Sequence, residues 1–301
     1  MNGWINLYKP SGVTSQRCLN QIKHMIPKTK IGHAGTLDPL ACGVLPVALG
    51  EATKALPYIL DTTKEYIFDV TWGQERATDD SQGDVLLSSD NRPSPEDILK
   101  ILPQFMGTIS QVPPLYSANK IQGQRACNLM RKGREDIVLQ AKTLDVYALN
   151  LKETLSPDFT RFFVQCAQGT YVRSLARDMG RLLGCYGYAS MIERVRSGPF
   201  TKDQTISLEK LAEYGKMSIV QESILPLQAV LDDIPAVLVS FDEAVRLKSG
   251  QSLVIGPDRL QGATSPQVLV FYEEMPVAMA VVEGSEIKPQ RVFNLNFERK
   301  N

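Results

Sequence analysis

Residues 32–46 combine side chains that can do chemistry with residues that shape a loop. His33 and Asp38 bring an imidazole and a carboxylate within six residues, a pair that could carry acid–base or nucleophilic chemistry. Pro39 biases the residue before it toward an extended backbone, so the Asp38 carboxylate should project from a loop. Three glycines let the backbone turn and approach a ligand closely: Gly32, Gly35 and Gly43. An Asp before a Pro is ordinarily a turn residue, but the whole run indicates a functional site.

The surrounding pattern predicts a mixed α/β fold that would hold this loop. Runs of apolar, β-branched and aromatic residues predict strands at 4–8, 44–49, 66–72 and 161–167. Helices are expected at 15–25, at 171–183 and after Ser94 and Pro95, which are typical of a helix start. Residues 74–94 are polar and acidic and are expected to form a long loop.

The helix expected at 171–183 carries three arginines on one face, because they recur at every fourth position. Arg177 and Arg181 are expected to form a solvated stripe, paired with Asp178 or its neighbours. Arg173 differs because it lies at the helix start beside Gly169, where its guanidinium can hold a carboxylate with two hydrogen bonds.

Five segments in a fixed order make the pattern specific. They are Asn-Leu-Tyr-Lys-Pro-Ser-Gly-Val-Thr-Ser at 6–15, Gly-His-Ala-Gly-Thr-Leu-Asp-Pro at 32–39, Gly-Glu-Ala-Thr-Lys at 50–54, Lys-Glu-Tyr at 64–66 and Gly-Thr-Tyr-Val-Arg-Ser at 169–174. Over most of residues 3–200 the chain therefore closely resembles the TruB family of pseudouridine synthases. The resemblance implies the pseudouridine synthase fold and the isomerisation of a uridine in the T loop of tRNA (position 55), with no cofactor.

The resemblance also implies roles for individual residues. Asp38 would be the catalytic nucleophile or a charge stabiliser at C1′, Tyr66 would stack on the uracil and assist proton removal, and Arg173 would hold Asp38. Because the target base must leave its stack, His33 would fill the vacated space. The resemblance implies four more substrate-binding residues. Lys9 and Lys54 would contact phosphate or brace the loop, Tyr171 lies close to Arg173, and Asp80 would order the site.

The distribution of charge fits an RNA-binding enzyme although the net charge is zero. Lys and Arg outnumber Asp and Glu six to two in residues 1–60, six to two in 115–142 and seven to two in 161–202, whereas 61–114 and 203–301 are acidic. Phosphate binding requires a local positive surface and not a positive total. We therefore expect tRNA as the partner, through its T arm and acceptor stem. A solvated mixed surface is the alternative for any one segment.

Composition argues against several other classes. No stretch approaches the roughly 20 apolar residues of a membrane span, and the N-terminal residues lack a secretory pattern, so we expect a cytoplasmic protein. The five scattered cysteines are expected to be reduced, and two histidines are too few for a typical zinc site, so no metal is expected. We expect a monomer without a protein partner.

A break in the pattern near 225–235 predicts two domains, a catalytic domain at 1–230 and a small β-rich domain at 236–301. Strands are expected at 236–240, 267–272, 276–282 and 291–295. The position of this small domain resembles that of the PUA-like barrel of many relatives. Its acidic charge leaves two roles open, a modest RNA contact or a structural cap.

Two other kinds of function compete with this prediction. A non-catalytic tRNA-binding or folding chaperone would share the basic surface but would not need Asp38, Tyr66 and Arg173 together. A hydrolase using His33 and Asp38 would need a Ser or Cys nucleophile in a motif such as Gly-x-Ser-x-Gly, which the sequence lacks. The sequence therefore favours a synthase.

Overall fold

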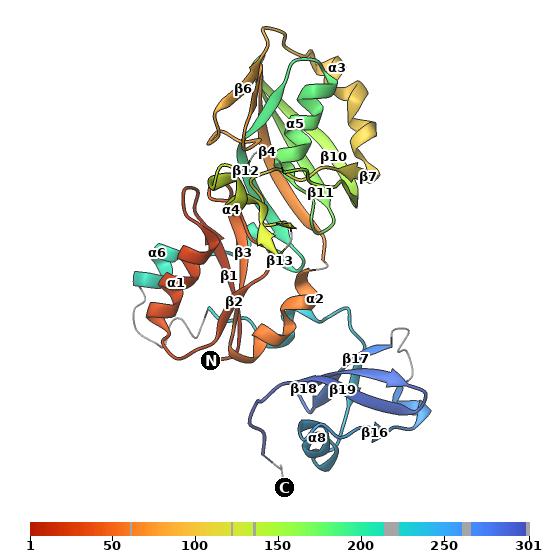
Figure 1. Ribbon diagram of the computed structural model, residues 1–301. Coiled ribbons are helices and arrows are strands. Elements are labelled where there is room, and N and C mark those ends of the chain that lie inside the picture. Colours follow the sequence, from red (N-terminus) through yellow and green to blue (C-terminus); the bar gives the residue numbers. More distant parts are fainter. Residues whose placement is uncertain (61, 122, 135–136, 214–222, 261–265, 299–301) are drawn as a thin grey trace.

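The computed structural model describes residues 1–60, 62–121, 123–134, 137–213, 223–260 and 266–298. Within them, one mixed sheet contains ten strands: β1 (Gly3–Lys9), β2 (Ile31–His33), β3 (Cys42–Leu49), β4 (Lys64–Trp72), β7 (Gly107–Gln111), β10 (Lys142–Ser156), β11 (Phe159–Cys166), β12 (Gly187–Ser197), β13 (Phe200–Thr201) and β14 (Ile206–Ser207). Their order is β14-β1-β3-β12-β4-β11-β10-β7, with β2 beside β3 and β13 beside β12. Figure 1 shows this sheet running along the larger part of the molecule.

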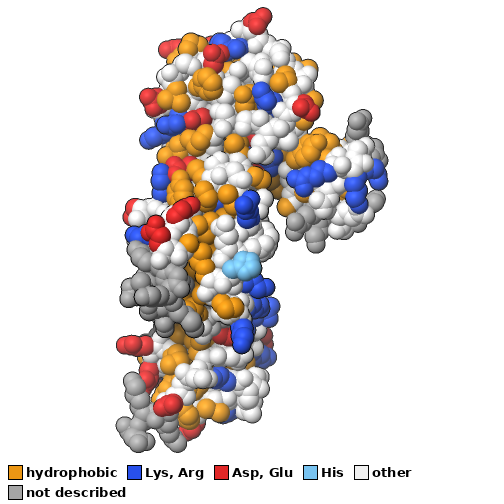
Figure 2. Space-filling view, turned by 90° about the vertical axis from the view of Figure 1, so that its left-hand side faces the viewer, with side chains coloured by type: hydrophobic (Ala, Val, Ile, Leu, Met, Phe, Trp, Pro, Cys, Tyr) orange, Lys and Arg blue, Asp and Glu red, His pale blue; other side chains and the backbone are white. Residues whose placement is uncertain are grey.

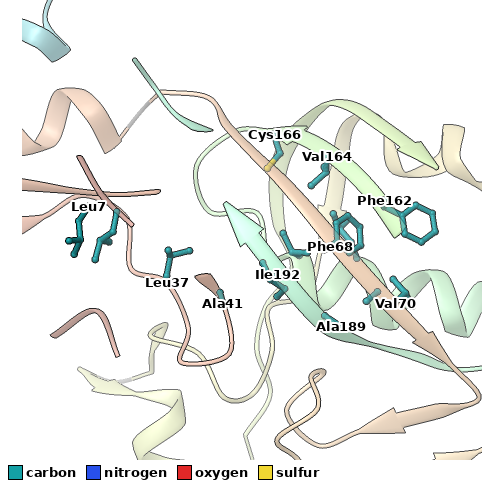
Figure 3. Close-up of a cluster of buried hydrophobic side chains, with 14 of the residues drawn as sticks. Leu7, Leu37, Ala41, Phe68, Val70, Phe162, Val164, Cys166, Ala189 and Ile192 are labelled. Atoms are coloured by element: carbon teal, nitrogen blue, oxygen red, sulfur yellow. The ribbon is translucent and has the colours of Figure 1, made fainter. Parts of the chain in front are cut away.

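Helices cover one face of the sheet along its length. They are α1 (Ser15–Met25), α3 (Pro95–Ile101), α5 (Val172–Leu182) and α6 (Leu208–Glu213). Apolar side chains of all four helices belong to one cluster with those of the strands beneath them. Alternate residues supply the strand side of this core, such as Phe68 and Val70 of β4, and Phe68 stacks on Phe162 of β11 with ring centroids 5.3 Å apart (Figure 3).

The opposite face of the sheet, around β1 and β3, carries a second apolar cluster. It includes Trp4 of β1, Val44 of β3 and Ile59 of α2 (Leu56–Leu60). Leu269 and Met279 of a smaller sheet pack into the same cluster, which therefore joins the two parts of the molecule.

The smaller sheet lies below the larger part in Figure 1 and has the order β15-β17-β18-β19-β16. Its elements are β15 (Ala236–Leu238), α8 (Phe241–Lys248), β16 (Leu253–Val254), β17 (Gln267–Tyr272), β18 (Met275–Glu283) and β19 (Glu286–Val292). The remaining helices and strands are β5 (Gln74–Arg76), β6 (Val85–Ser88), β8 (Lys120–Ile121), β9 (Gln124–Arg125) and α4 (Ala126–Arg131), with 3-10 turns η1 (Gly50–Ala55), η2 (Leu102–Phe105), η3 (Lys202–Gln204), η4 (Leu227–Val230) and η5 (Pro257–Leu260).

The predicted class, a mixed α/β fold with a β-rich C-terminal part, is confirmed, and two local expectations are wrong. The segment 74–94 is not one long loop, because β5 and β6 pair as a hairpin and Arg76 stacks over the ring of Tyr188 at 4.7 Å. The last expected strand, 291–295, is shifted, since β19 ends at Val292. The domain boundary between 230 and 236 stays a prediction. In the described part of the chain, none of the helices is long and apolar enough to span a membrane.

Candidate active site

Asp38 and Arg173 form the centre of the site. Asp38 lies in the segment between β2 and β3, and 40% of its side chain is exposed, whereas Arg173 in the first turn of α5 is only 3% exposed. The Nε of Arg173 lies 2.9 Å from Oδ2 of Asp38, as an ion pair and not as an aligned hydrogen bond. The carboxylate therefore has a fixed cation behind it and an open edge toward solvent.

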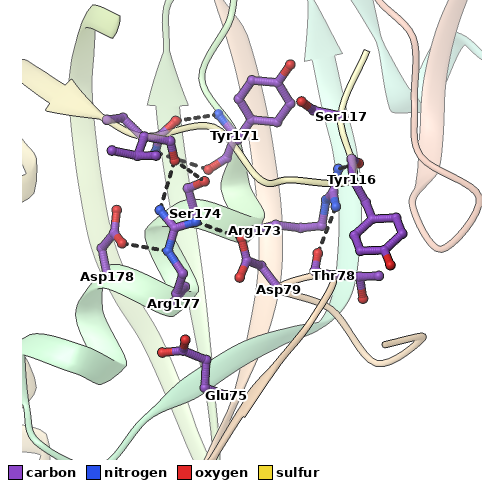
Figure 4. Close-up of polar contacts among 12 residues, drawn as sticks. Glu75, Thr78, Asp79, Tyr116, Ser117, Tyr171, Arg173, Ser174, Arg177 and Asp178 are labelled. Carbon is purple, nitrogen blue, oxygen red and sulfur yellow. Dashed lines mark hydrogen bonds and ion pairs between the residues drawn. The ribbon is translucent and has the colours of Figure 1, made fainter. Parts of the chain in front are cut away.

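Backbone carbonyls hold the guanidinium of Arg173 in place (Figure 4). Its Nη1 donates to the carbonyl of Thr78 at 2.8 Å and its Nη2 to that of Tyr116 at 3.2 Å. Asp80 adds a buried negative charge, with Oδ2 3.8 Å from Nη1, and its Oδ1 accepts from the Thr78 hydroxyl and from the backbone of Gln82. The acid at position 80 thus orders the turn that binds Arg173.

Two tyrosines flank the ion pair. Tyr66 is half-buried on β4, where burial raises the pKa of its hydroxyl and the charge of Arg194 opposes that rise. Tyr171 immediately precedes α5, and its hydroxyl accepts a hydrogen bond from Asn119 at 3.1 Å. Burial raises the pKa of Tyr171 as well. Both side chains are therefore neutral phenols near pH 7.

Lys9 braces the Asp38 loop and does not reach the surface. It is fully buried, and its ammonium donates to the carbonyls of Pro10, Val13 and Pro39, at 2.9, 2.5 and 3.4 Å. Burial lowers the pKa of Lys9. Of its two expected roles, these contacts match bracing of the loop, whereas contact with a phosphate would require the loop to open.

His33 ends β2 and carries a neutral imidazole at pH 7. Burial, with a smaller contribution from the charge of Arg194, lowers the pKa of His33 below its usual value. Its Nδ1 is buried without a hydrogen-bond partner in the described structure. A partly exposed, uncharged ring of this kind can pack against bases.

The polar contacts of Lys54 do not involve the Asp38–Arg173 pair. Its ammonium pairs with Glu51 at 2.6 Å and donates to the carbonyl of Val292 in the smaller sheet at 2.7 Å. Lys54 therefore joins the two parts of the molecule. With Tyr58 and Arg291 it also lines a hollow of about 530 Å³ between them.

Arg194 of β12 is a site residue that the sequence reasoning missed. It is 1% exposed, and it donates from Nε to the carbonyl of Val44 at 2.7 Å and from Nη2 to that of Gly35 at 2.9 Å. A Cβ at Gly35 would lie 3.0 Å from Nη1, and a Cβ at Gly43 would lie 2.2 Å from the Arg194 carbonyl oxygen. In this structure these two glycines allow a close approach of the backbone to Arg194. Its position two residues after buried Ile192 in a strand is the signal that could have revealed it.

Arg177 is also more buried than expected. Its side chain is 7% exposed and pairs with Asp79 and Asp178, both at 2.8 Å, while Nη2 donates to the carbonyl of Val112 at 2.8 Å (Figure 4). The expectation of a solvated position is wrong because the β5–β6 turn and the segment after β7 cover this face of α5. Arg181, by contrast, is 54% exposed, as expected for the stripe, but its partner at 2.7 Å is Glu75 of β5.

The surface near the site is hollowed and basic. Figure 2 shows a notch between the main body and a lobe that projects from it, with Lys and Arg side chains on the lobe and along the same edge of the body. The lobe carries α4, where Arg131 is exposed, and Lys132 directly after this helix is exposed as well. Within the described residues, there is no group of three His, Cys, Asp or Glu side chains arranged to hold a metal ion.

Comparison with known proteins gives the class. A family model described as TruB family pseudouridylate synthase (N terminal domain) matches residues 23–172, and one described as tRNA pseudouridylate synthase B C-terminal domain matches residues 173–236. The fold is similar to that of a chain in a crystal structure of a Cbf5–Nop10–Gar1 complex, with a TM-score of 0.72, 26% identity, and coverage of 97% of this chain and 84% of that one. Fold and site thus define a pseudouridylate synthase.

Relatives that match nearly the whole chain show which family of pseudouridylate synthases it resembles. The chain is 43% identical to tRNA pseudouridine synthase B of Nitrobacter winogradskyi, over 98% of this chain and 84% of the relative. It is 43% identical to the protein of the same name from Zymomonas mobilis, over 98% and 96%. The chain belongs to the TruB family.

Proposed function

We propose that this chain isomerises uridine to pseudouridine in tRNA, at position 55 of the T loop, with Asp38 as the nucleophile. Membership of the TruB family supports the reaction, and the name of the curated relatives, tRNA pseudouridine synthase B, supports tRNA as the substrate. The observation that carries the role of Asp38 is its exposed carboxylate beside a buried arginine. A non-catalytic tRNA chaperone is disfavoured because the site and the relatives are those of a synthase.

The proposed reaction balances without a cofactor. The N1–C1′ bond of the uridine breaks, the uracil turns, a C5–C1′ bond forms, C5 loses its proton and N1 gains one. Asp38 either attacks C1′ or stabilises the positive charge that develops there. Its open edge makes it available to the ribose, and the ion pair with Arg173 orients it.

The neighbouring groups support a pocket for a flipped-out base. Tyr66 stacks on the uracil and its hydroxyl assists removal of the C5 proton, while Tyr171 closes the other side. His33, uncharged, fills the space that the base leaves, which offsets part of an unstacking cost of a few kcal/mol. Asp80 acts through Arg173 and is a positioning residue.

The charge of the surface supports binding of the T arm in the notch beside the lobe. Exposed Arg131 at the end of α4 and Lys132 directly after it are available to phosphates. The hollow near Lys54 and Arg291 has the charge to accept a phosphate of the acceptor stem. We further propose that the protein acts as a monomer, without a protein partner, in the cytoplasm where tRNA is modified.

Tritium release from T-arm RNA labelled at C5 of uridine tests this function. We expect release by the wild-type chain and none by Asp38→Asn, because the new bond requires loss of the C5 hydrogen. Asp90→Asn, an exposed carboxylate at the far end of the β5–β6 hairpin, is the matched control and should retain activity. RNA binding without release by the wild-type chain would favour the chaperone, and release that persists when U55 is replaced by cytidine would refute the position.

A further inference from the structure

Arg194 is a buried cation that, within the described residues, has no carboxylate partner. No Asp or Glu oxygen of these residues lies within 4.0 Å of its guanidinium, which donates to the carbonyl oxygens of Val44 and Gly35. Burying a charge is costly unless hydrogen bonds compensate it, and here the carbonyls of Val44 and Gly35 do so. The arginine is therefore held by the backbone of the elements around it and not by an opposite charge.

The location of Arg194 connects the parts of the site. Its Nη2 binds the carbonyl of Gly35, in the segment that carries Asp38, and its Nε binds β3 just after that segment. On the other side, Arg194 pairs across the sheet with Tyr66 of β4, so the two side chains lie on the same face of neighbouring strands. The charge of Arg194 favours the ionised form of the Tyr66 hydroxyl, against the larger opposing effect of burial on its pKa.

We propose that Arg194 is a positioning residue for the isomerisation, which holds the segment carrying Asp38 and the hydroxyl of Tyr66 in a fixed relation. The inference rests on the proposed function, in which Asp38 acts at C1′ and Tyr66 acts at the C5 proton of one uridine. One planar guanidinium can span three elements at once, whereas the ammonium of a lysine offers no such fork. Gly35, with a φ of +70°, leaves room for Nη1 where a side chain would displace it.

A double-mutant cycle on the intact chain tests the proposal. Single-turnover rates are measured on T-arm RNA for wild type, Arg194→Met, Tyr66→Phe and the double variant, together with RNA affinity. We expect Arg194→Met to lower the rate about 100-fold, the loss typical of a misplacement near 1 Å, with RNA affinity within about threefold. In the Arg194→Met background, Tyr66→Phe should lower the single-turnover rate by a factor at least about tenfold smaller than in the wild type. The reason is that the hydroxyl is already misplaced. Arg196→Met is the matched control, since Arg196 lies on the same strand, is 46% exposed and pairs with Glu65.

Each outcome decides the proposal. An unchanged rate in Arg194→Met, or two losses that multiply, would overturn it, because a structural role alone does not couple to Tyr66. If Arg194→Met does not fold, Arg194→Lys and Gly35→Ala replace it. Both should lower the rate and reduce the effect of Tyr66→Phe, and full activity in both would refute the role. Absence of pseudouridine with the wild-type chain would instead refute the proposed function itself, and the inference with it.

Discussion

Replacement of Asp38 by Asn separates catalysis from folding and binding. The substitution keeps the shape of the side chain and removes its charge, so the proposed nucleophile is lost while the loop and Arg173 keep their backbone contacts. We expect turnover to fall by at least about 10⁴-fold, as for other essential nucleophiles. RNA affinity should stay within about tenfold, because no phosphate contact is removed.

The structure sets the magnitude of the stability change. Asp38 is 40% exposed, so solvent screens its ion pair with Arg173 and the pair is worth about 1 kcal/mol or less. Without Asp38, the guanidinium still donates to the carbonyls of Thr78 and Tyr116 and still faces Asp80. The free energy of unfolding of Asp38→Asn should therefore lie within about 1 kcal/mol of the wild-type value.

Three measurements on the same preparation check this reasoning. Tritium release gives turnover, filter binding of T-arm RNA gives affinity, and urea denaturation gives the free energy of unfolding. A destabilisation of about 3 kcal/mol or more would show that the ion pair is a structural element. Retained turnover would refute Asp38 as the nucleophile, whatever the stability.

The remaining predictions concern stability and are all measured by urea denaturation. Arg177→Met should destabilise by about 3 kcal/mol, because it leaves a buried aspartate unpaired, and a loss near zero would contradict this account. Glu243 in α8 pairs with Arg259, which lowers the pKa of Glu243 to about 2 from 4.5, so this pair stabilises the fold above about pH 4.5 and its contribution is lost as the pH falls toward 2. Because Arg259 is substantially exposed, the effect should be about 1 kcal/mol and absent in Glu243→Gln. Gly43→Ala should cost about 3 kcal/mol, since its φ is +102° and the new Cβ would meet a backbone oxygen at 2.2 Å, whereas Gly12→Ala, with φ +80° and open space, should cost about 1 kcal/mol.

Secondary structure could be predicted where the periodicity is strong. The helix expected at 15–25 coincides with α1, and Thr14 caps it by accepting from the backbone of Arg17 at 3.1 Å. The hairpin β5–β6 could not be predicted in this way, because the side chains of β6 are all exposed and show no alternation. Its support is tertiary, from the stacking of Arg76 and the pairing of Glu75 with Arg181. Helix α8 was not predicted either, because residues 236–240 were expected to form a strand, although Ser240 and Glu243 form a capping box that signals the start of α8.

The residues of the site also differ in how well the sequence predicts them. Asp38, Tyr66 and Arg173 could be grouped only through the order of the five motifs, since no local pattern links a loop, a strand and a helix far apart in the chain. Arg194 could not be placed from the sequence, because its neighbours come from the pairing of β12 with β3 and with β4. Which strands become neighbours depends on the whole sheet and not on the residues around position 194.

The arrangement of charge explains why the site of an enzyme that acts on RNA can contain the exposed carboxylate of Asp38. Lys9, Arg173 and Arg194 are all buried, and backbone carbonyls accept hydrogen bonds from each of them. The charges of Lys9 and Arg173 are nevertheless close to Asp38, which acts electrostatically on the Lys9 ammonium and pairs with Arg173. In a partly buried site such charges are less screened than at the surface, so they offset the repulsion that Asp38 would exert on a phosphate backbone. Removal of the Asp38 charge makes the net local charge more positive, although Asp80 still faces Arg173. Any change in RNA affinity of Asp38→Asn should therefore be toward tighter binding, and the loss of turnover cannot come from loss of the substrate.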